Sequence, residues 1–410
     1  MREMKDSGVD WIGEIPHDWE IVQTKRVFRS IKRVVGNQVG EYERLALTLN
    51  GVIKRSKEDN EGLQPEKFEG YQILKENELV FKLIDLENVK TSRVGLSSYT
   101  GLVSPAYIVL TNESKDNRFY YYWFMFMYYN EVFNHLGGDG VRSALNAKDL
   151  TAIPVPFINE CKQHRIADYL DEKCSKIDAI IKKQQTVIEK LKAYKLSKIN
   201  ELIVEVEGQS IHLGYIANMK NGLNFNAVPN GKPLKFLGVA DFKDYFVLNR
   251  EDMFSDILID EEIDEDYMLK DGDIVFVRSN GSKDLVGRAV MVENIDFPLS
   301  YSGFCIRFRN IRTDILNDRY LLYFFRSPYF RKQLKKYSQG SNINNINQVL
   351  LSQISITVPS IEIQKRAIDD VERLSYNLDK TILGKQALID KLIAYKKSLI
   401  YEVVTGKKEI

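Results

Sequence analysis

The stretch EKLKAYKLSKINE (Glu189–Glu201) returns as DKLIAYKKSLIYE (Asp390–Glu402), 201 positions further along the chain. Upstream of it, QHRIADYL from Gln163 returns at the same spacing as QKRAIDDV from Gln364. Matching pieces at one constant spacing indicate an internal duplication, and the period is far longer than that of a solenoid repeat. The chain therefore contains two copies of one unit and presents two copies of one working surface.

Long helices are predicted for both copies of this stretch. Residues 163–205 contain neither proline nor glycine, and Lys, Glu, Gln, Ala, Leu and Ile dominate, all of which favour helix. Apolar side chains recur in both copies close to a heptad spacing, as in the seam of a coiled coil. The seam consists of Leu170, Ile177, Ile181, Ile188 and Leu191 in the first copy and of Leu378, Ile382, Ile389 and Leu392 in the second.

The two seams are expected to pack on each other as a coiled coil. Each is interrupted by a polar residue at the matching place, Gln184 in the first and Lys385 in the second. Because a globular unit lies between the two helices in the chain, the expected packing is antiparallel. Two separate amphipathic helices, each docked on its own domain, are the alternative.

Short strands are predicted in the globular unit before each helix. ELVFKLI (Glu78–Ile84) and DIVFVRS (Asp273–Ser279) are apolar and follow turn residues, as strands do. AYIVLT (Ala106–Thr111) and FCIRFRN (Phe304–Asn310) have the pattern of a later pair of strands.

Aromatic-rich helices are predicted after these strands. RFYYYWFMFMYYN (Arg118–Asn130) and RYLLYFFRSPYF (Arg319–Phe330) carry rings that either stack on bases or, in the interpretation we favour, pack in the core. The predicted fold class is α+β, with two mixed α/β domains separated by two long antiparallel helices and related by an internal pseudo-two-fold repeat. The predicted boundaries are residues 1–157 for the first domain, 158–207 for the central helix, 208–359 for the second domain and 360–410 for the distal helix.

The composition argues against several classes of function. The formal net charge of +1 at pH 7 argues against a strong non-specific nucleic-acid binder acting alone, because such proteins are basic. The three cysteines lack CxxC spacing, which fits a reducing cytoplasm, and no apolar run is long enough to span a membrane. Asn-Pro-Pro-Tyr and Asp-Pro-Pro-Tyr motifs, glycine-rich cofactor loops and histidines at ligand spacing are missing from the sequence. We therefore expect no catalytic centre and no metal site in this chain.

Basic and polar side chains are concentrated in the loops that differ between the two copies. Arg, Lys, Asn and Gln are the residue types that bond to the edges of guanine and adenine. Ordinary solvated loop residues are the alternative, since loops are polar in most proteins. The candidate nucleic-acid contacts are Lys82, Lys90, Arg93, Arg142 and Ser143 in the first unit, and Arg278, Asn280, Ser282, Lys283, Arg288, Asn342 and Asn344 in the second.

Several segments together resemble the specificity subunits of type I restriction–modification systems. They are the opening KDSGVDWIGEIPHDWE (Lys5–Glu20), LKDGDIVF (Leu269–Phe276), the loop GDGVRSALNAKDLTAIPVP (Gly138–Pro156) and the start of the first helix, ECKQHRIADYLDEKCSKID (Glu160–Asp178). The resemblance covers essentially the whole chain. The second helix begins in VPSIEIQKRAI, which matches the pattern less well and leaves the start of that helix open.

This resemblance implies a sequence-specific subunit that reads a bipartite double-stranded DNA target through two target recognition domains. It implies that the helix pair sets the distance between the half-sites and docks two methyltransferase subunits, with restriction subunits as further partners. S-adenosylmethionine would be bound by the partner methyltransferase, and this chain would hold no cofactor and catalyse no reaction. A stand-alone coiled-coil protein adaptor and a DNA nuclease or methyltransferase are the alternative functions.

Overall fold

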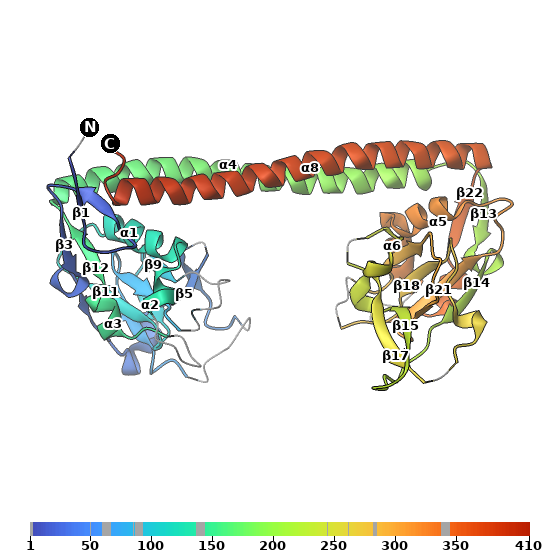
Figure 1. The fold of residues 1–410 in the computed structure, drawn as a ribbon, viewed down its shortest axis with the longest axis horizontal. Helices are drawn as coiled ribbons and strands as arrows, with labels where there is room; N and C mark the ends of the chain where they lie inside the picture. The colour runs from blue at the N-terminus through green and yellow to red at the C-terminus, as the bar shows by residue number, and fades with distance from the viewer. Residues whose placement is uncertain are drawn as a thin grey trace. The chain divides into compact units, whose positions relative to one another are not determined.

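The structure is a computed structural model of the 410-residue chain, and its contacts divide the chain into two compact units. It describes residues 3–49, 51–59, 67–84, 86, 93–136, 144–243, 245–260, 262–281, 285–337 and 345–410. The first unit contains residues 1–184 and 387–410, and the second contains residues 185–386. Each unit combines one mixed domain with parts of two 44-residue helices, α4 (Glu160–Ile203) and α8 (Ile361–Val404) (Figure 1).

Two four-stranded sheets form the centre of the first domain. Their strand orders are β6-β5-β10-β7 and β4-β11-β8-β9, and two further pairs are β1-β2 and β12-β3. β5 and β10 pair in parallel, whereas β11 pairs antiparallel with both β4 and β8. The strands are β1 (Met4–Asp6), β2 (Glu14–Pro16), β3 (Glu20–Gln23), β4 (Arg29–Ser30), β5 (Arg44–Thr48), β6 (Gly51–Arg55), β7 (Gln72–Leu74), β8 (Leu79–Phe81), β9 (Val94–Leu96), β10 (Gly101–Val103), β11 (Ile108–Thr111) and β12 (Pro154–Phe157). The helices are α1 (Arg118–Tyr129), α2 (Val132–Leu136) and α3 (Ala147–Ala152).

A five-stranded sheet of order β14-β21-β18-β19-β16 forms the centre of the second domain. A three-stranded sheet, β17-β15-β20, and the pair β13-β22 complete it. The strands are β13 (Gln209–His212), β14 (Ala217–Asn221), β15 (Lys232–Leu237), β16 (Val247–Leu248), β17 (Ser255–Ile259), β18 (Ile274–Val277), β19 (Ala289–Val292), β20 (Leu299–Tyr301), β21 (Cys305–Asn310) and β22 (Ser355–Val358). The helices are α5 (Asp318–Phe325), α6 (Pro328–Tyr337) and α7 (Gln348–Ser352). The predicted α+β class is therefore confirmed.

The aromatic-rich helices pack in the cores of the two domains, as favoured from the sequence. Phe124 of α1 meets Phe81 of β8 edge-on, with ring centroids 4.9 Å apart. In the second domain Phe325 of α5 meets Phe276 of β18 in the same way, at 4.8 Å. All four rings are buried, so these aromatic residues serve packing rather than base stacking.

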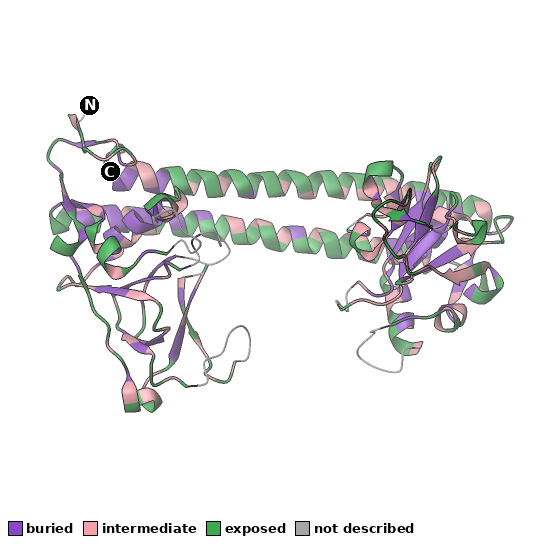
Figure 2. Ribbon diagram, turned by 60° about the horizontal axis from the view of Figure 1, so that its bottom comes forward, coloured by how far each residue is buried: buried purple, intermediate pink, exposed green. Residues whose placement is uncertain are grey.

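In the first unit the segments of α4 and α8 lie antiparallel. Lys396 Nζ of α8 donates to Asp178 of α4 at 2.7 Å, and Arg165 Nη2, nearer the start of α4, donates at 2.7 Å to the main-chain oxygen of Ile410, which lies beyond the end of α8, so the numbering runs in opposite directions. Figure 2 shows buried strands in the middle of each domain, among which β8 and β18 are buried throughout, whereas long stretches of the helix surface are exposed. Among the predicted seam residues, Leu170, Ile177, Ile188 and Ile389 are buried, and Ile181, Leu191, Leu378, Ile382 and Leu392 are partly buried.

The same helix contact occurs in the second unit with the roles of the helices exchanged. There Lys195 Nζ of α4 donates to Asp379 of α8 at 2.8 Å. Asp379 and Lys396 are the second-copy equivalents of Asp178 and Lys195, so one ion pair is built twice by the duplication. The start of the second helix, which the sequence left open, lies at Ile361, 201 positions after the first residue of α4.

Candidate nucleic-acid interface

Loops of the second domain converge at the end of strand β18. This strand pairs antiparallel with β21 on one side and with β19 on the other, so its last residues adjoin the first residues of both neighbours. Val277 pairs with Cys305 at the start of β21, and its N–H donates to the Arg288 carbonyl, just before β19, at 2.9 Å. β14 ends at the same place, because Asn221 pairs with Ile306. Sheet topology thus gathers residues that are far apart in the sequence.

We call this place the β18 edge. The backbone of Arg278 joins two segments there, since its N–H donates to the Phe304 carbonyl at 2.7 Å and its carbonyl accepts from the Ile346 N–H at 2.9 Å. Ser279 forms a β-bridge with Asn345, which places Asn345 close to Arg278. The residues that define the β18 edge are Asn224, Arg278, Ser279, Asn280, Arg288, Phe304 and Asn345.

The side chains of the β18 edge suit the recognition of nucleic acid. Arg278 is partly exposed, and its Nη1 donates to the Gly303 carbonyl at 3.1 Å. Because a guanidinium carries five N–H donors in a fork, this single bond orients Arg278 and leaves donors for a further acceptor. Arg288 is also partly exposed and donates through Nη1 to the Lys243 carbonyl. Arginine and asparagine are the residue types that read guanine and adenine edges.

The structure brings together three of the predicted contacts of the second domain, namely Arg278, Asn280 and Arg288. Four others, Ser282, Lys283, Asn342 and Asn344, lie outside the described residues. Sequence reasoning missed Phe304, because FCIRFRN has the pattern of a strand and a strand phenylalanine is usually buried. In the structure β21 begins only at Cys305, and Phe304 lies in the preceding turn with 57 % of its surface exposed.

In the first domain β8 occupies the position that β18 has in the second. Phe81 pairs with Val94 of β9 and with Ile108 of β11. Lys82 follows Phe81, is partly exposed, and donates its N–H to the Arg93 carbonyl at 2.9 Å. Lys82 therefore remains a candidate contact, and the other candidates Lys90, Arg142 and Ser143 lie outside the described residues.

Arg93 has a different environment from the other candidate contacts. Only 2 % of its surface is exposed. Its guanidinium donates to the carbonyl of Ile84 at 3.0 Å and to that of Leu86 at 2.8 Å. Buried main-chain carbonyls need such donors, so Arg93 stabilises the segment that follows β8. We therefore do not carry it forward as a DNA contact.

An arginine at the start of each aromatic helix ties the domain to a long helix. In the first unit, Arg118 Nη1 of α1 donates to Asp171 of α4 at 2.5 Å, and Tyr122 OH donates to the other carboxylate oxygen at 2.6 Å. In the second unit, Arg319 Nη1 of α5 donates to Glu372 of α8 at 2.7 Å. These equivalent contacts orient each domain on the helix segment of its own unit.

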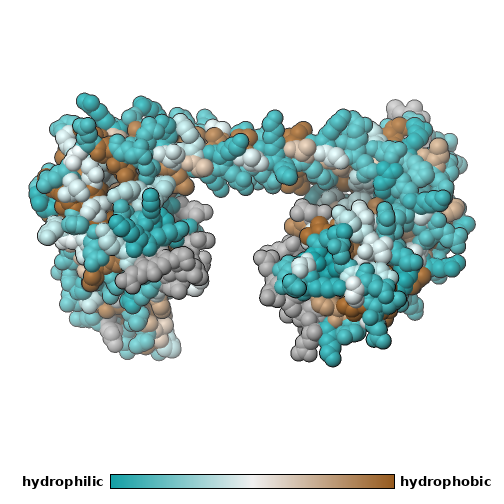
Figure 3. All heavy atoms as spheres, turned by 180° about the vertical axis from the view of Figure 1, so that it is seen from behind, coloured by the Kyte–Doolittle hydropathy of each residue, from teal (hydrophilic) through white to brown (hydrophobic). Residues whose placement is uncertain are grey.

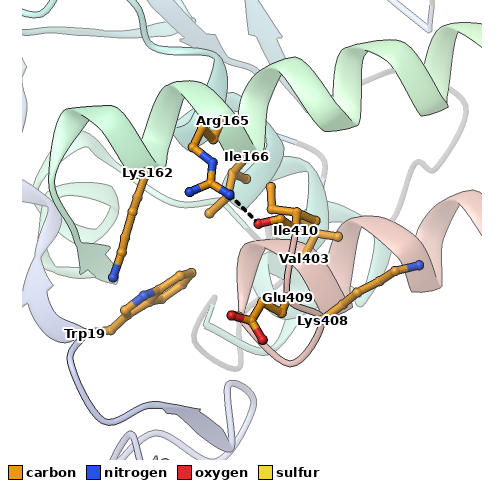
Figure 4. Close-up of a pocket in the computed structure, with 9 residues that line it drawn as sticks. Trp19, Lys162, Arg165, Ile166, Val403, Lys408, Glu409 and Ile410 are labelled. Atoms are coloured by element: carbon orange, nitrogen blue, oxygen red, sulfur yellow. Dashed lines mark hydrogen bonds between the residues drawn. The ribbon is translucent and has the colours of Figure 1, made fainter. Parts of the chain in front are cut away.

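A cavity of about 210 Å³ in the first unit lies where the end of α8 meets α4 (Figure 4). Trp19, Lys162 and Glu409 line it, and the Arg165 guanidinium in its wall is bonded to the main-chain oxygen of Ile410 (Figure 4). This arrangement joins the end of α8 to α4.

The described residues contain no group of side chains suited to a metal ion, and two of the cysteines are buried. Within them, no three His, Cys, Asp or Glu side chains are grouped so that they could hold a metal ion. Burial raises the pKa of the Cys174 thiol to about 11 and that of Cys305 further, so neither thiol ionises readily. No described helix is long and apolar enough to cross a membrane.

The structure thus contains two α/β domains related by a duplication, two long helices and a polar strand edge. Together these features indicate a DNA specificity protein. The family profile named Type I restriction modification DNA specificity domain matches residues 16–190 and 230–390 of this chain, one segment for each copy of the repeat. The chain therefore belongs to the type I restriction–modification DNA specificity family.

Two specificity subunits show the similarity at the level of sequence. The StySPI specificity subunit of Salmonella potsdam is 26 % identical over 144 residues, which cover 35 % of this chain and 30 % of the relative. The EcoKI specificity subunit of Escherichia coli (strain K12) is 26 % identical over 145 residues, which cover 35 % of this chain and 31 % of the relative. The match thus spans less than a third of the length of each of these relatives.

Solved structures show the similarity at the level of fold. A chain from work on complex assembly and conformational transition of the type I R-M system superposes with a TM-score of 0.71 at 13 % identity, covering 95 % of this chain and 98 % of that one. The HsdS subunit from Thermoanaerobacter tengcongensis gives a TM-score of 0.50 at 14 % identity, covering 96 % and 98 %.

Proposed function

We propose that this chain is the specificity subunit of a type I restriction–modification complex and reads a bipartite double-stranded DNA target, one half-site with each domain. The observation that carries the proposal is the β18 edge, where separate loops bring Arg278, Asn280, Arg288 and Asn345 together. On the face seen in Figure 3, hydrophilic residues cover much of both domains, which is compatible with DNA binding. Because the loops differ between the copies, the two half-sites are expected to differ in sequence.

We further propose that α4 and α8 dock two methyltransferase subunits, one on each copy of the repeated helix surface. Tyr194 and Tyr395 occupy equivalent positions of the repeat, and they are 48 % and 55 % exposed. Tyrosine is enriched where proteins bind one another, and two equivalent tyrosines fit two equivalent partners. Restriction subunits join the same assembly.

Catalysis is assigned to the partners in this proposal. The methyltransferase binds S-adenosylmethionine and methylates adenine, while this chain positions it on the target. The near-neutral net charge of +1 is consistent with such a division, because the methyltransferases then share the phosphate contacts.

The test is to assemble the chain with its methyltransferase partner and to map methylated adenines in DNA exposed to the complex. The expected motif has two half-sites and an unread spacer. Replacing residues 1–157 with the corresponding domain of a relative should change one half of the motif, and replacing residues 208–359 should change the other. A motif that stays the same in both replacements would instead indicate a protein adaptor that does not read DNA.

A further inference from the structure

One turn has the same geometry in both domains but carries different side chains. Between β20 and β21, the Phe304 N–H donates to Ser302 Oγ at 3.3 Å and the Cys305 N–H donates to the Ser302 carbonyl at 2.8 Å. Between β10 and β11 of the first domain, the Ala106 N–H donates to Ser104 Oγ, also at 3.3 Å. The duplication thus places a phenylalanine where its counterpart has only a methyl group.

Phe304 is exposed although the residues around it are part of the core. Tyr301, which ends β20, and Cys305, which begins β21, are both fully buried, whereas Phe304 is 57 % exposed. A single exposed apolar residue is common on protein surfaces and does not by itself indicate a site. Its position at the β18 edge is what distinguishes Phe304.

The backbone around Phe304 is held from two sides. The Phe304 carbonyl accepts from the Arg278 N–H at 2.7 Å. Gly303 donates its N–H to the Leu223 carbonyl at 2.7 Å, and its carbonyl accepts from Arg278 Nη1 at 3.1 Å. The Asn224 side chain lies so close to Gly303 that a Cβ there would collide with it. A ring presented by a fixed backbone loses little conformational entropy when it makes a contact.

We propose that Phe304 makes an apolar contact with a base of the second DNA half-site, an inference that rests on the proposed function. In double-stranded DNA the base faces are stacked on one another, so an aromatic side chain in the major groove contacts the exposed methyl group of thymine, beside donors that bond to base edges or phosphates. Arg278 and Asn345 supply such donors near Phe304. This polar surrounding fits nucleic acid better than the apolar centre of a protein interface.

The contact belongs to one half-site only. Ala106 is held by the same turn in the first domain, but its side chain is too short to reach a base in the way that a phenyl ring does. The two domains therefore differ in apolar contacts as well as in their polar loops.

The experiment compares Phe304→Ala, Phe304→Leu and the matched first-domain variant Ala106→Phe in the assembled methyltransferase complex. Affinity is measured by fluorescence anisotropy on a duplex that carries both half-sites, and methylated adenines are mapped in parallel. Phe304→Ala is expected to weaken binding by about 5- to 150-fold, the range of one lost base contact, and to relax one position of the second half-site. Phe304→Leu should retain part of the affinity, and Ala106→Phe should leave the second half-site unchanged.

The dependence of affinity on salt separates a base contact from a phosphate contact. For Phe304→Ala the slope of log affinity against log salt should equal that of the unaltered complex, because no phosphate contact is lost. Unchanged affinity and an unchanged motif for Phe304→Ala overturn the inference. The inference is also overturned if Phe304→Ala impairs only the assembly with the methyltransferase. If the unaltered complex neither binds nor methylates a defined sequence, the proposed function itself fails.

Discussion

Arginines in corresponding loops have different environments in the two domains. Arg93 is buried and donates to the carbonyls of Ile84 and Leu86, whereas Arg278 is partly exposed and is oriented by one bond to Gly303. Both were predicted as DNA contacts, because a sequence shows the guanidinium and not the acceptors around it. Separate substitutions can distinguish a stabilising arginine from a recognising one.

Arg93→Ala should lower the stability of the first domain by about 2–4 kcal/mol, since it leaves the carbonyls of Ile84 and Leu86 without this donor and opens a void in place of a buried side chain. The measurement is thermal unfolding of the full chain. Arg29→Ala, at an exposed arginine of β4 in the same domain, should change stability by less than about 0.5 kcal/mol. Equal effects of the two substitutions would contradict the stabilising role of Arg93.

Arg278→Ala should weaken DNA binding of the assembled complex and lower its melting temperature only slightly, since one partly exposed hydrogen bond, to Gly303, is lost. A base contact would cost about 1–3 kcal/mol and relax one position, and a phosphate contact would reduce the salt slope by about one unit. The control is Arg250→Ala. Arg250 follows β16, which runs parallel to β19 and so ends at the other end of the sheet from the β18 edge. Unchanged binding by Arg278→Ala would remove Arg278 from the interface.

At the scale of the element, helix α8 continues without interruption through a glycine. Gly384 lies within the continuous helix Ile361–Val404, and a Cβ built on it meets nothing within 4 Å. Glycine is about 1 kcal/mol less favourable than alanine inside a helix. Gly384 therefore lowers the stability of α8, and no close packing within the second unit requires a glycine at this position.

Gly384→Ala should raise stability by about 0.5–1 kcal/mol, measured as a shift of the urea unfolding midpoint. Gly287→Ala should have the opposite effect, because Gly287 has a φ of +79° and an added Cβ would collide with Leu334. A loss of stability with Gly384→Ala would show that the helix requires the glycine.

At the scale of the whole molecule, the duplication builds the same contacts twice. The ion pairs Asp178–Lys396 and Lys195–Asp379 are equivalent under the repeat, one in each unit. Both helices extend without interruption past the polar breaks of their seams at Gln184 and Lys385. In the proposed function, the length of these helices sets the unread spacer of the DNA target.

Inserting four residues after Gln184 and four after Lys385 should lengthen the spacer and leave both half-site sequences as they were. Four helical residues add about 6 Å, which equals one to two base pairs at about 3.4 Å each. The paired insertions sit at equivalent positions of the repeat, so the contacts within each unit are retained. The measurement is the methylated motif, after gel filtration has shown that the complex assembles. An active complex with the original spacer would contradict the role of the helices.

Much of the architecture could be predicted because it depends on local patterns. The duplication, the two helices with their heptad seams and the core role of the aromatic segments follow from spacing and composition, which act over a few turns or strands. The candidate DNA contacts were harder to predict, as Arg93 shows. Whether a loop residue is buried or exposed depends on neighbours that are distant in the sequence.

The sequence by itself determined that this chain is a two-copy protein of the type I specificity family with paired antiparallel helices. Only the tertiary structure decided which loop residues meet. Asn224, Arg278, Phe304 and Asn345 come together because β18 pairs with β21 and Ser279, just after β18, bridges to Asn345, so residues far apart in the chain share one edge. Hydrophobic spacing is a local property of the chain, whereas strand pairing joins distant segments. The candidate interface depends on strand pairing.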